Sequence, residues 1–169
     1  MPLKKTSFPQ NIIILTILYG IVTFVLMGLL TLIYFFIKGS GYTPVIIWNY
    51  LILFLTMFFG VKAFQKKNNI IKVTFKETYI TGVFIGLIAS IGFAFFMIIY
   101  TKFIDFEFIN NFVSINTLQI NKNINAEVLS LQIQRITSVS IGFYAFGQLF
   151  LISLFLPLLI FIFFKYKKI

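Results

Sequence analysis

Long apolar stretches alternate with short polar segments along the whole chain. Four of the stretches reach the roughly 20 residues that a helix needs to cross a bilayer core of about 30 Å. They run over about residues 12–37, 45–64, 79–100 and 141–164, and no charged side chain interrupts the middle of any of them. Because backbone groups in lipid must be hydrogen-bonded internally, each stretch is expected to be helical. The pattern predicts an all-α integral membrane protein, a single membrane domain over residues 1–169 with four transmembrane helices.

The longest connection, over residues 101–140, joins the third and fourth stretches. Its apolar residues recur at helical spacing in two groups, separated by the polar segment 116–125. We predict two amphipathic helical pieces that rest against the outer membrane surface. The first piece could simply prolong the third span, and the second could lead into the fourth. The first group is Ile109, Phe112 and Val113, and the second is Leu129, Ile133 and Ile136.

The second piece carries a start signal and also a competing interpretation. Asn125 is a suitable helix cap, and Glu127 would lie in the first turn, where a carboxylate is favoured. However, Leu129, Leu131 and Ile133 also alternate as they would in a β-strand. This connection is the one segment large enough to form an external contact site, and it could equally do no more than cap the bundle.

Composition supports the membrane prediction. Hydrophobic residues make up 60% of the chain, charged residues make up 11%, and the mean hydropathy is +1.01. An ordinary soluble domain is about 45–50% apolar and about 25% charged. A chain with so few charges cannot cover a water-facing surface, so lipid must be its main solvent.

Side chains that usually carry catalysis or bind metals are scarce. The chain has no cysteine and no histidine, which excludes disulfides, thiol chemistry and imidazole ligands. Asp105 and Glu107 are two residues apart, so on a helix they would not face each other. No phosphate-binding glycine loop or nucleophile turn is present. We therefore expect no enzyme activity, no catalytic residue, no cofactor and no metal site.

The distribution of charge predicts the orientation in the membrane. Ten of the 14 basic residues lie before the first span, between the end of the second span (Lys62 included) and the third, or after the fourth. The positive-inside rule then places both termini and the central connection in the cytoplasm. The net charge of +10 follows from this topology, so we expect no nucleic-acid partner. Aromatic residues near the span ends fit interfacial belts: Tyr42, Trp48, Tyr79, Tyr100 and Tyr166.

Small residues form a stripe on the third span. Gly82, Gly86 and Ser90 recur every four residues, which lets two helix backbones approach closely. The stripe could pack inside the four-helix bundle, or it could serve self-association or docking to another subunit. Gly142 and Gly147 could offer a similar surface on the fourth span.

A few polar residues lie in or next to the spans. Lys62 and Glu77 flank the central connection and could form an ion pair. Asn49 and Gln148 are the strongest polar side chains within the spans, and we expect both to hydrogen-bond across helices. Pro157 is expected to bend the fourth span, because it frees one backbone acceptor. If the protein moves a solute, Asn49, Gln148 and Pro157 are the residues expected to line its path.

The stretch from the second span into the third resembles a bacterial membrane family, catalogued as domain of unknown function 4199. The resemblance rests on Phe59-Gly60-Val61-Lys62, a short basic loop, Val73-Thr74-Phe75-Lys76-Glu77, and then the small residues of the third span. Members of that family are similar in length, with four helices and a long connection before the last. The outer connection here has fewer charges than is usual in the family. The resemblance implies the inner (cytoplasmic) membrane of a bacterium, and it supplies no activity and no site residues.

These observations favour a non-enzymatic partner or accessory subunit of a membrane assembly. Its partners would be the lipid bilayer and another membrane protein or a second copy of the chain. The alternative is a small oligomeric transporter or channel for lipid-like or weakly polar solutes.

Overall fold

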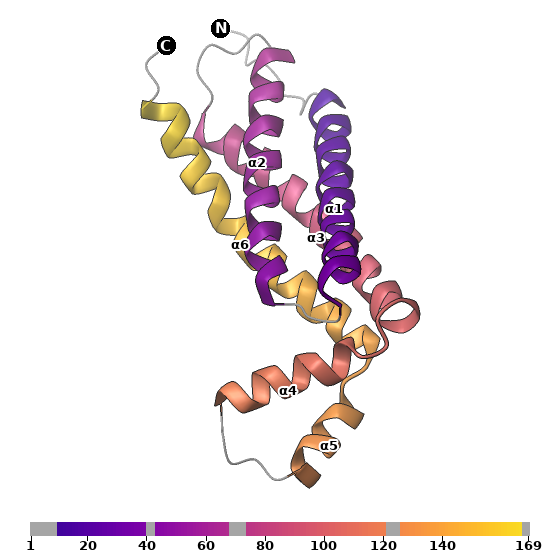
Figure 1. Ribbon diagram of the computed structural model, residues 1–169. Helices are drawn as coiled ribbons and strands as arrows, with labels where there is room; N and C mark the ends of the chain where they lie inside the picture. Colours follow the sequence, from indigo (N-terminus) through magenta and orange to yellow (C-terminus); the bar gives the residue numbers. More distant parts are fainter. Residues whose placement is uncertain (1–9, 40–42, 68–73, 121–125, 167–169) are drawn as a thin grey trace, which may run out of the picture.

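The computed structural model describes residues 10–39, 43–67, 74–120 and 126–166. In these ranges the backbone is almost entirely helical and contains no β-strand. The six helices are α1 (Gln10–Lys38), α2 (Thr43–Lys67), α3 (Phe75–Phe103), α4 (Phe108–Ile120), α5 (Ala126–Arg135) and α6 (Ser138–Tyr166) (Figure 1).

Four of the helices, α1, α2, α3 and α6, are long and apolar enough to cross a membrane. This finding confirms that a helix of spanning length and apolarity forms at each of the four predicted positions. Each helix extends a few residues beyond its predicted span, because polar and basic residues at the ends are compatible with a helix that reaches the membrane surface. Gly39 ends α1 with a positive φ of 77°, and its N–H donates to the Phe35 carbonyl at 2.8 Å.

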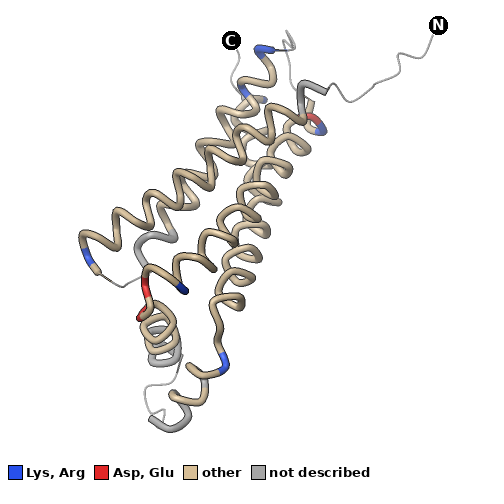
Figure 2. The backbone as a smooth tube through the Cα atoms, turned by 90° about the vertical axis from the view of Figure 1, so that its right-hand side faces the viewer, with Lys and Arg blue, Asp and Glu red and all other residues tan. Residues whose placement is uncertain are grey.

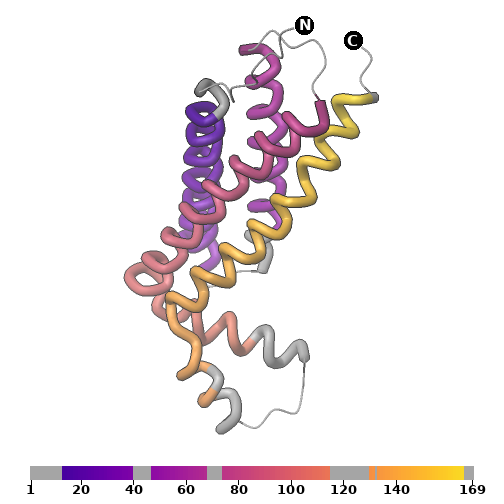
Figure 3. The backbone as a smooth tube through the Cα atoms, turned by 180° about the vertical axis from the view of Figure 1, so that it is seen from behind, coloured from indigo at the N-terminus to yellow at the C-terminus, as the bar shows by residue number. Residues whose placement is uncertain are grey.

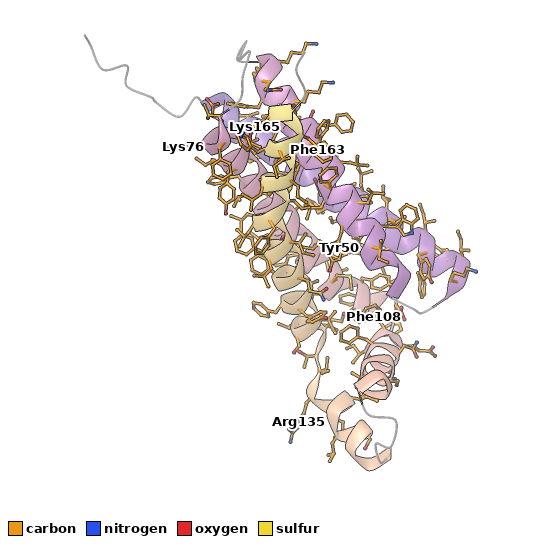
Figure 4. The ribbon with its side chains drawn as sticks, turned by 90° about the vertical axis from the view of Figure 1, so that its left-hand side faces the viewer. Tyr50, Lys76, Phe108, Arg135, Phe163 and Lys165 are labelled. Atoms are coloured by element: carbon orange, nitrogen blue, oxygen red, sulfur yellow. The ribbon has the colours of Figure 1, made fainter. Side chains whose placement is uncertain are left out.

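The bundle has two distinct ends. The lysine-rich end is where α1 begins, α2 ends, α3 begins and α6 ends (Figure 1). Several basic residues lie there (blue in Figure 2), and Figure 4 labels two of them, Lys76 and Lys165. The hairpin end lies opposite and carries α4 and α5, which form the α4–α5 hairpin. Among the described residues, the basic side chains at the lysine-rich end are those of Lys62, Lys66, Lys67, Lys76 and Lys165.

Helix α3 is the centre of the bundle, because α1, α2 and α6 all pack against it (Figure 3). Its contact with α6 is the most extensive and its contact with α1 the next. The buried apolar side chains between the helices include Met57, Ile85, Phe93 and Met97. Large apolar side chains also cover the outside, and Phe95, Phe143 and Phe155 are each at least 65% exposed. An apolar core inside an equally apolar surface is what a lipid environment requires.

Hydroxyl groups in the bundle are mostly satisfied within their own helices. Thr31 and Thr101 donate to backbone carbonyls four residues earlier, both at 2.9 Å. Thr23 on α1 makes a bond between helices, since its hydroxyl donates to the hydroxyl of Thr56 on α2 at 2.8 Å. Thr23 therefore has a role in packing that its sequence position did not indicate.

Candidate functional site

The small-residue stripe of α3 lies against α6. A methyl group at Gly82 would lie 2.5 Å from Cγ of Pro157, and one at Gly86 would overlap the side chain of Ser153. Ser90 is buried, and its hydroxyl donates to the Gly86 carbonyl at 2.7 Å. The structure thus uses the stripe for packing within one chain, with α6 where a second copy or a partner helix would have to lie.

The two glycines of α6 differ in their surroundings. A methyl group at Gly142 would lie 2.5 Å from Cγ1 of Ile98, so this glycine also belongs to the α3–α6 interface. A methyl group at Gly147 would meet no other atom within 4 Å. The similar surface expected at both positions is therefore present only at Gly142.

The intramembrane polar residues do not meet one another. Asn49 is buried at 2% exposure, and its Oδ1 accepts no hydrogen bond from the described residues. Gln148 donates through Nε2 to the hydroxyl of Tyr144, four residues earlier on the same helix, at 2.6 Å. Neither side chain makes the expected hydrogen bond to another helix within the part of the chain that the structure describes.

Gln148 and Pro157 also lie on different sides of α6. They are nine residues apart, and 3.6 residues per turn place such positions on opposite faces of a helix. Pro157 packs against Gly82 on α3, whereas Gln148 is only half-buried. These contacts do not favour the common polar path that a transporter would need.

The expected ion pair between Lys62 and Glu77 is not formed, although both residues lie in described ranges. Lys62 is exposed, and the Glu77 carboxylate instead accepts from the Thr74 N–H at 2.9 Å and from the Thr74 hydroxyl at 2.8 Å. Thr74 in turn caps α3, because its Oγ1 accepts from the Glu77 N–H at 3.3 Å. This reciprocal capping box engages one oxygen of the carboxylate at the start of its own helix, which a pair with Lys62 would have to compete with.

The capping box predicts an unequal effect of two substitutions. Thr74→Ala should lower the free energy of unfolding by about 1 kcal/mol, because it removes the acceptor for an N–H at the start of α3. It should also speed amide hydrogen exchange at Glu77. Lys62→Gln is the matched control and should change neither quantity measurably. Equal effects of the two variants in hydrogen exchange would show that Lys62 does pair with Glu77.

At the hairpin end a buried carboxyl group fixes the turn out of α3. Asp105 is 2% exposed, and its Oδ2 accepts from the Tyr100 hydroxyl at 3.0 Å. The Asp105 N–H donates to the Tyr100 carbonyl at 2.9 Å, and the Phe108 N–H donates to the Asp105 carbonyl at 3.2 Å. These bonds join the last turn of α3 to the first turn of α4, so α4 is a separate helix and does not prolong α3.

Aromatic rings continue the connection from α3 to α4 and α6. The Tyr100 ring meets the rings of Phe35 on α1 and Phe108 on α4, with centroids 5.9 and 5.8 Å apart. Phe112, one turn further along α4, meets Tyr144 on α6 at 5.4 Å. Phe108 and Val113 are buried, which confirms an apolar face on α4. These contacts hold α4 against the bundle.

The second helix of the hairpin is less enclosed. Helix α5 packs against α4 and lies beyond the four long helices (Figure 1). Leu131 is 51% exposed, and Gln134 and Arg135 are exposed (Figure 4 labels Arg135). The helix over Ala126–Arg135 decides against the strand interpretation, while the proposed cap Asn125 lies outside the described residues.

Sequence reasoning missed Tyr100 and Asp105 as a pair. Tyr100 was expected in an interfacial belt, yet it is 3% exposed and bonded to Asp105. The available signal was a tyrosine in the last turn of a span with a carboxylate five residues later. Their hydrogen bond links the last turn of α3 to the turn that leads into the hairpin.

Comparisons with known proteins add no functional information to this geometry. No protein-family model, curated protein or solved structure matches the chain.

Proposed function

We propose that this protein is a non-enzymatic subunit of a membrane assembly and that the α4–α5 hairpin contacts its partner. The observation that supports this proposal is the placement of the hairpin. It projects from one end of the bundle, whereas α6 already covers the small-residue stripe of α3. Buried contacts around Asp105 fix the start of the hairpin to the bundle, while residues of α5 are exposed. A surface that is both fixed in place and accessible suits docking.

The chemistry of the exposed helix indicates the kind of partner. Leu131 offers an apolar contact, and Gln134 and Arg135 add a donor-rich polar edge on the same helix. Arginine is enriched at protein interfaces relative to the rest of the surface. We propose a partner whose surface, near the membrane boundary, combines an apolar patch with a carboxylate for Arg135.

We further propose a cellular location and a family. The lysine-rich end would face the cytoplasm of a bacterium, which would leave the hairpin on the outer side of the inner membrane. The excess of basic residues at that end supports this orientation. The order of four long helices, with a long connection before the last, supports membership of the domain of unknown function 4199 family.

A site-specific photo-crosslinker tests the docking surface. Placed at Leu131 in native membranes, it should give one discrete protein adduct, because that side chain is exposed on the docking helix. The matched control is Phe155, which is 65% exposed on the outside of α6 and should give only lipid adducts. The readout is gel mobility followed by mass spectrometry of the adduct.

Three outcomes would count against the proposal. Leu131 could yield only lipid adducts, or an adduct with twice the mass of the chain, which indicates self-association. Equal protein adducts from Leu131 and Phe155 would indicate random collision. If the adduct is specific, Arg135→Glu should reduce it, since the substitution reverses the charge that the partner carboxylate would bind.

A further inference from the structure

Polar side chains of α2 and α6 come together toward the hairpin end of the bundle. Gln148 on α6 donates through Nε2 to the hydroxyl of Tyr144 at 2.6 Å. Tyr50 on α2 lies close enough to Tyr144 for the two side chains to interact electrostatically, and it lies between α2 and α6 (Figure 4). We call Tyr50, Tyr144 and Gln148 the α2–α6 polar cluster.

Aromatic rings border this cluster on two sides. Phe112 on α4 meets the Tyr144 ring with centroids 5.4 Å apart. Phe54 lies one turn after Tyr50 on the same face of α2, and its ring meets that of Phe163 on α6 at 6.2 Å. Tyr144 is 45% exposed, and the other two members of the cluster are half-buried. The surrounding membrane can therefore reach the cluster.

The two tyrosines leave hydrogen-bond donors unused. A tyrosine hydroxyl both donates and accepts, and the Tyr144 oxygen already accepts from Gln148. Within the part of the chain that the structure describes, no side chain or carbonyl accepts from the hydroxyl of Tyr144 or of Tyr50. A hydrocarbon tail cannot accept either, so each unused O–H group costs free energy in lipid. A ligand that offers an acceptor would remove this cost.

The depth of the cluster indicates which part of a lipid it meets. Tyr144 lies six residues after Ser138, the first residue of α6, which is about 9 Å along the helix axis. The spanning segment of α6 has 28 residues and is about 42 Å long, so a bilayer core of about 30 Å begins about 6 Å inside each end. The cluster therefore lies close to the boundary between hydrocarbon and headgroups, where the ester groups of glycerolipids lie.

The charge and the hydrogen-bond capacity of the cluster select the ligand group. Between Ser138 and Phe164 the α6 sequence has no charged side chain, so this helix offers no counter-charge to an ionised group. A carbonyl oxygen is neutral, donates nothing and has two lone pairs, so it can accept from two hydroxyls. It is the group that matches two unused donors at this depth.

We propose that the α2–α6 polar cluster binds the carbonyl group of a membrane lipid. The carbonyl oxygen accepts from the hydroxyls of Tyr144 and Tyr50, while Gln148 holds the Tyr144 oxygen in place. The hydrocarbon part lies along the exposed apolar side chains of α6, such as Leu151. The carbonyl can belong to a glycerolipid ester or to the ring of a lipid-soluble quinone, which would lie against the Phe112 and Tyr144 rings. This site does not depend on the partner proposed for the hairpin.

Native mass spectrometry of the purified protein in mild detergent tests this site. The probes are a diacyl phosphatidylcholine, its dialkyl ether analogue with chains of equal length, and a short-tailed ubiquinone. The wild type should retain the diacyl lipid at least about threefold more tightly than the ether lipid, because only the ester carbonyl can accept a hydrogen bond here. Tyr144→Phe keeps the ring but should retain both lipids equally. The matched control, Tyr79→Phe, removes a hydroxyl at the lysine-rich end of α3 and should keep the preference.

The ubiquinone identifies the source of the carbonyl. Preference for the diacyl lipid assigns the carbonyl to a glycerolipid ester. Equal retention of the two phosphatidylcholines, together with ubiquinone binding that Tyr144→Phe removes, assigns it to a quinone. If the wild type shows neither behaviour, the proposal is overturned.

A second variant keeps the test decisive. Tyr50→Phe should weaken retention of the same probe by about threefold, since it removes the other hydrogen bond. Circular dichroism checks that each variant is folded, and Tyr50→Phe decides the matter if Tyr144→Phe is not. Unchanged retention in both variants would overturn the proposal. Equal loss in Tyr79→Phe would also overturn it, because the effect would then not belong to the cluster.

Discussion

Gly86→Leu is expected to destabilise the bundle more than any other single change discussed here. A side chain at this position would overlap Cβ of Ser153 and lie 2.7 Å from Cε of Met57. The flexible end of Met57 can move aside, but Ser153 Cβ is fixed to the α6 backbone. The α3 and α6 helices must therefore move apart, which should lower the free energy of unfolding by about 1–3 kcal/mol or more. Thermal unfolding in detergent, followed by circular dichroism, should show a clear fall in midpoint.

Gly147→Leu is the control for this prediction. It makes the same change in a membrane-crossing helix, and the added side chain meets no other atom within 4 Å of its Cβ. Its unfolding midpoint should stay near that of the wild type. If both variants unfold at the same temperature, helix propensity or detergent binding, and not the α3–α6 contact, determines the stability.

The second large effect is expected from Tyr100→Phe. The substitution keeps the ring contacts with Phe35 and Phe108 but removes the hydroxyl that donates to the buried Asp105. Leaving a buried hydrogen-bond acceptor without its donor lowers the free energy of unfolding by about 1–3 kcal/mol. We expect a lower unfolding midpoint and faster amide hydrogen exchange at the start of α4, near Phe108.

A companion variant separates the hydrogen bond from the ring. Asp105→Asn keeps an acceptor oxygen for the Tyr100 hydroxyl, so its effect on exchange in α4 should be smaller than that of Tyr100→Phe. If Tyr100→Phe changes neither the midpoint nor the exchange rate, the aromatic contacts alone hold the hairpin. Leu131 cross-linking in the Tyr100→Phe background then shows whether the position of α5 depends on this bond.

The four membrane-crossing helices could be predicted because length and apolarity are local properties of the chain. The helices of the hairpin could be predicted for a similar reason, since Ile109, Phe112 and Val113 repeat at helical spacing. Which helix covers the small-residue stripe of α3 could not be predicted from the sequence. Gly82 and Gly86 show that some helix packs closely, but only the tertiary arrangement shows that Pro157 and Ser153 on α6 occupy the space.

The side-chain hydrogen bonds could not be predicted, because each polar group has several candidate partners and only the folded chain shows which one it meets. Glu77 was a candidate partner for Lys62 across a loop, but its carboxylate bonds to Thr74, three residues away. Ordering so short a segment costs less conformational entropy than ordering the whole loop. Asp105 becomes a partner of Tyr100 only because the chain turns after Ile104 and returns the carboxyl group to the α3 end. Asn49 shows the opposite case, a polar side chain whose Oδ1 accepts no hydrogen bond from the described residues.

The central place of α3 has a consequence for how the protein is made. Helices leave the ribosome in chain order, and α1 and α2 can meet each other before the helix that both pack against has been synthesised. Once α3 is inserted, its glycine stripe stays open to the membrane until the hairpin has been translated and α6 arrives. During that interval the nascent chain exposes a close-packing surface that the finished protein hides.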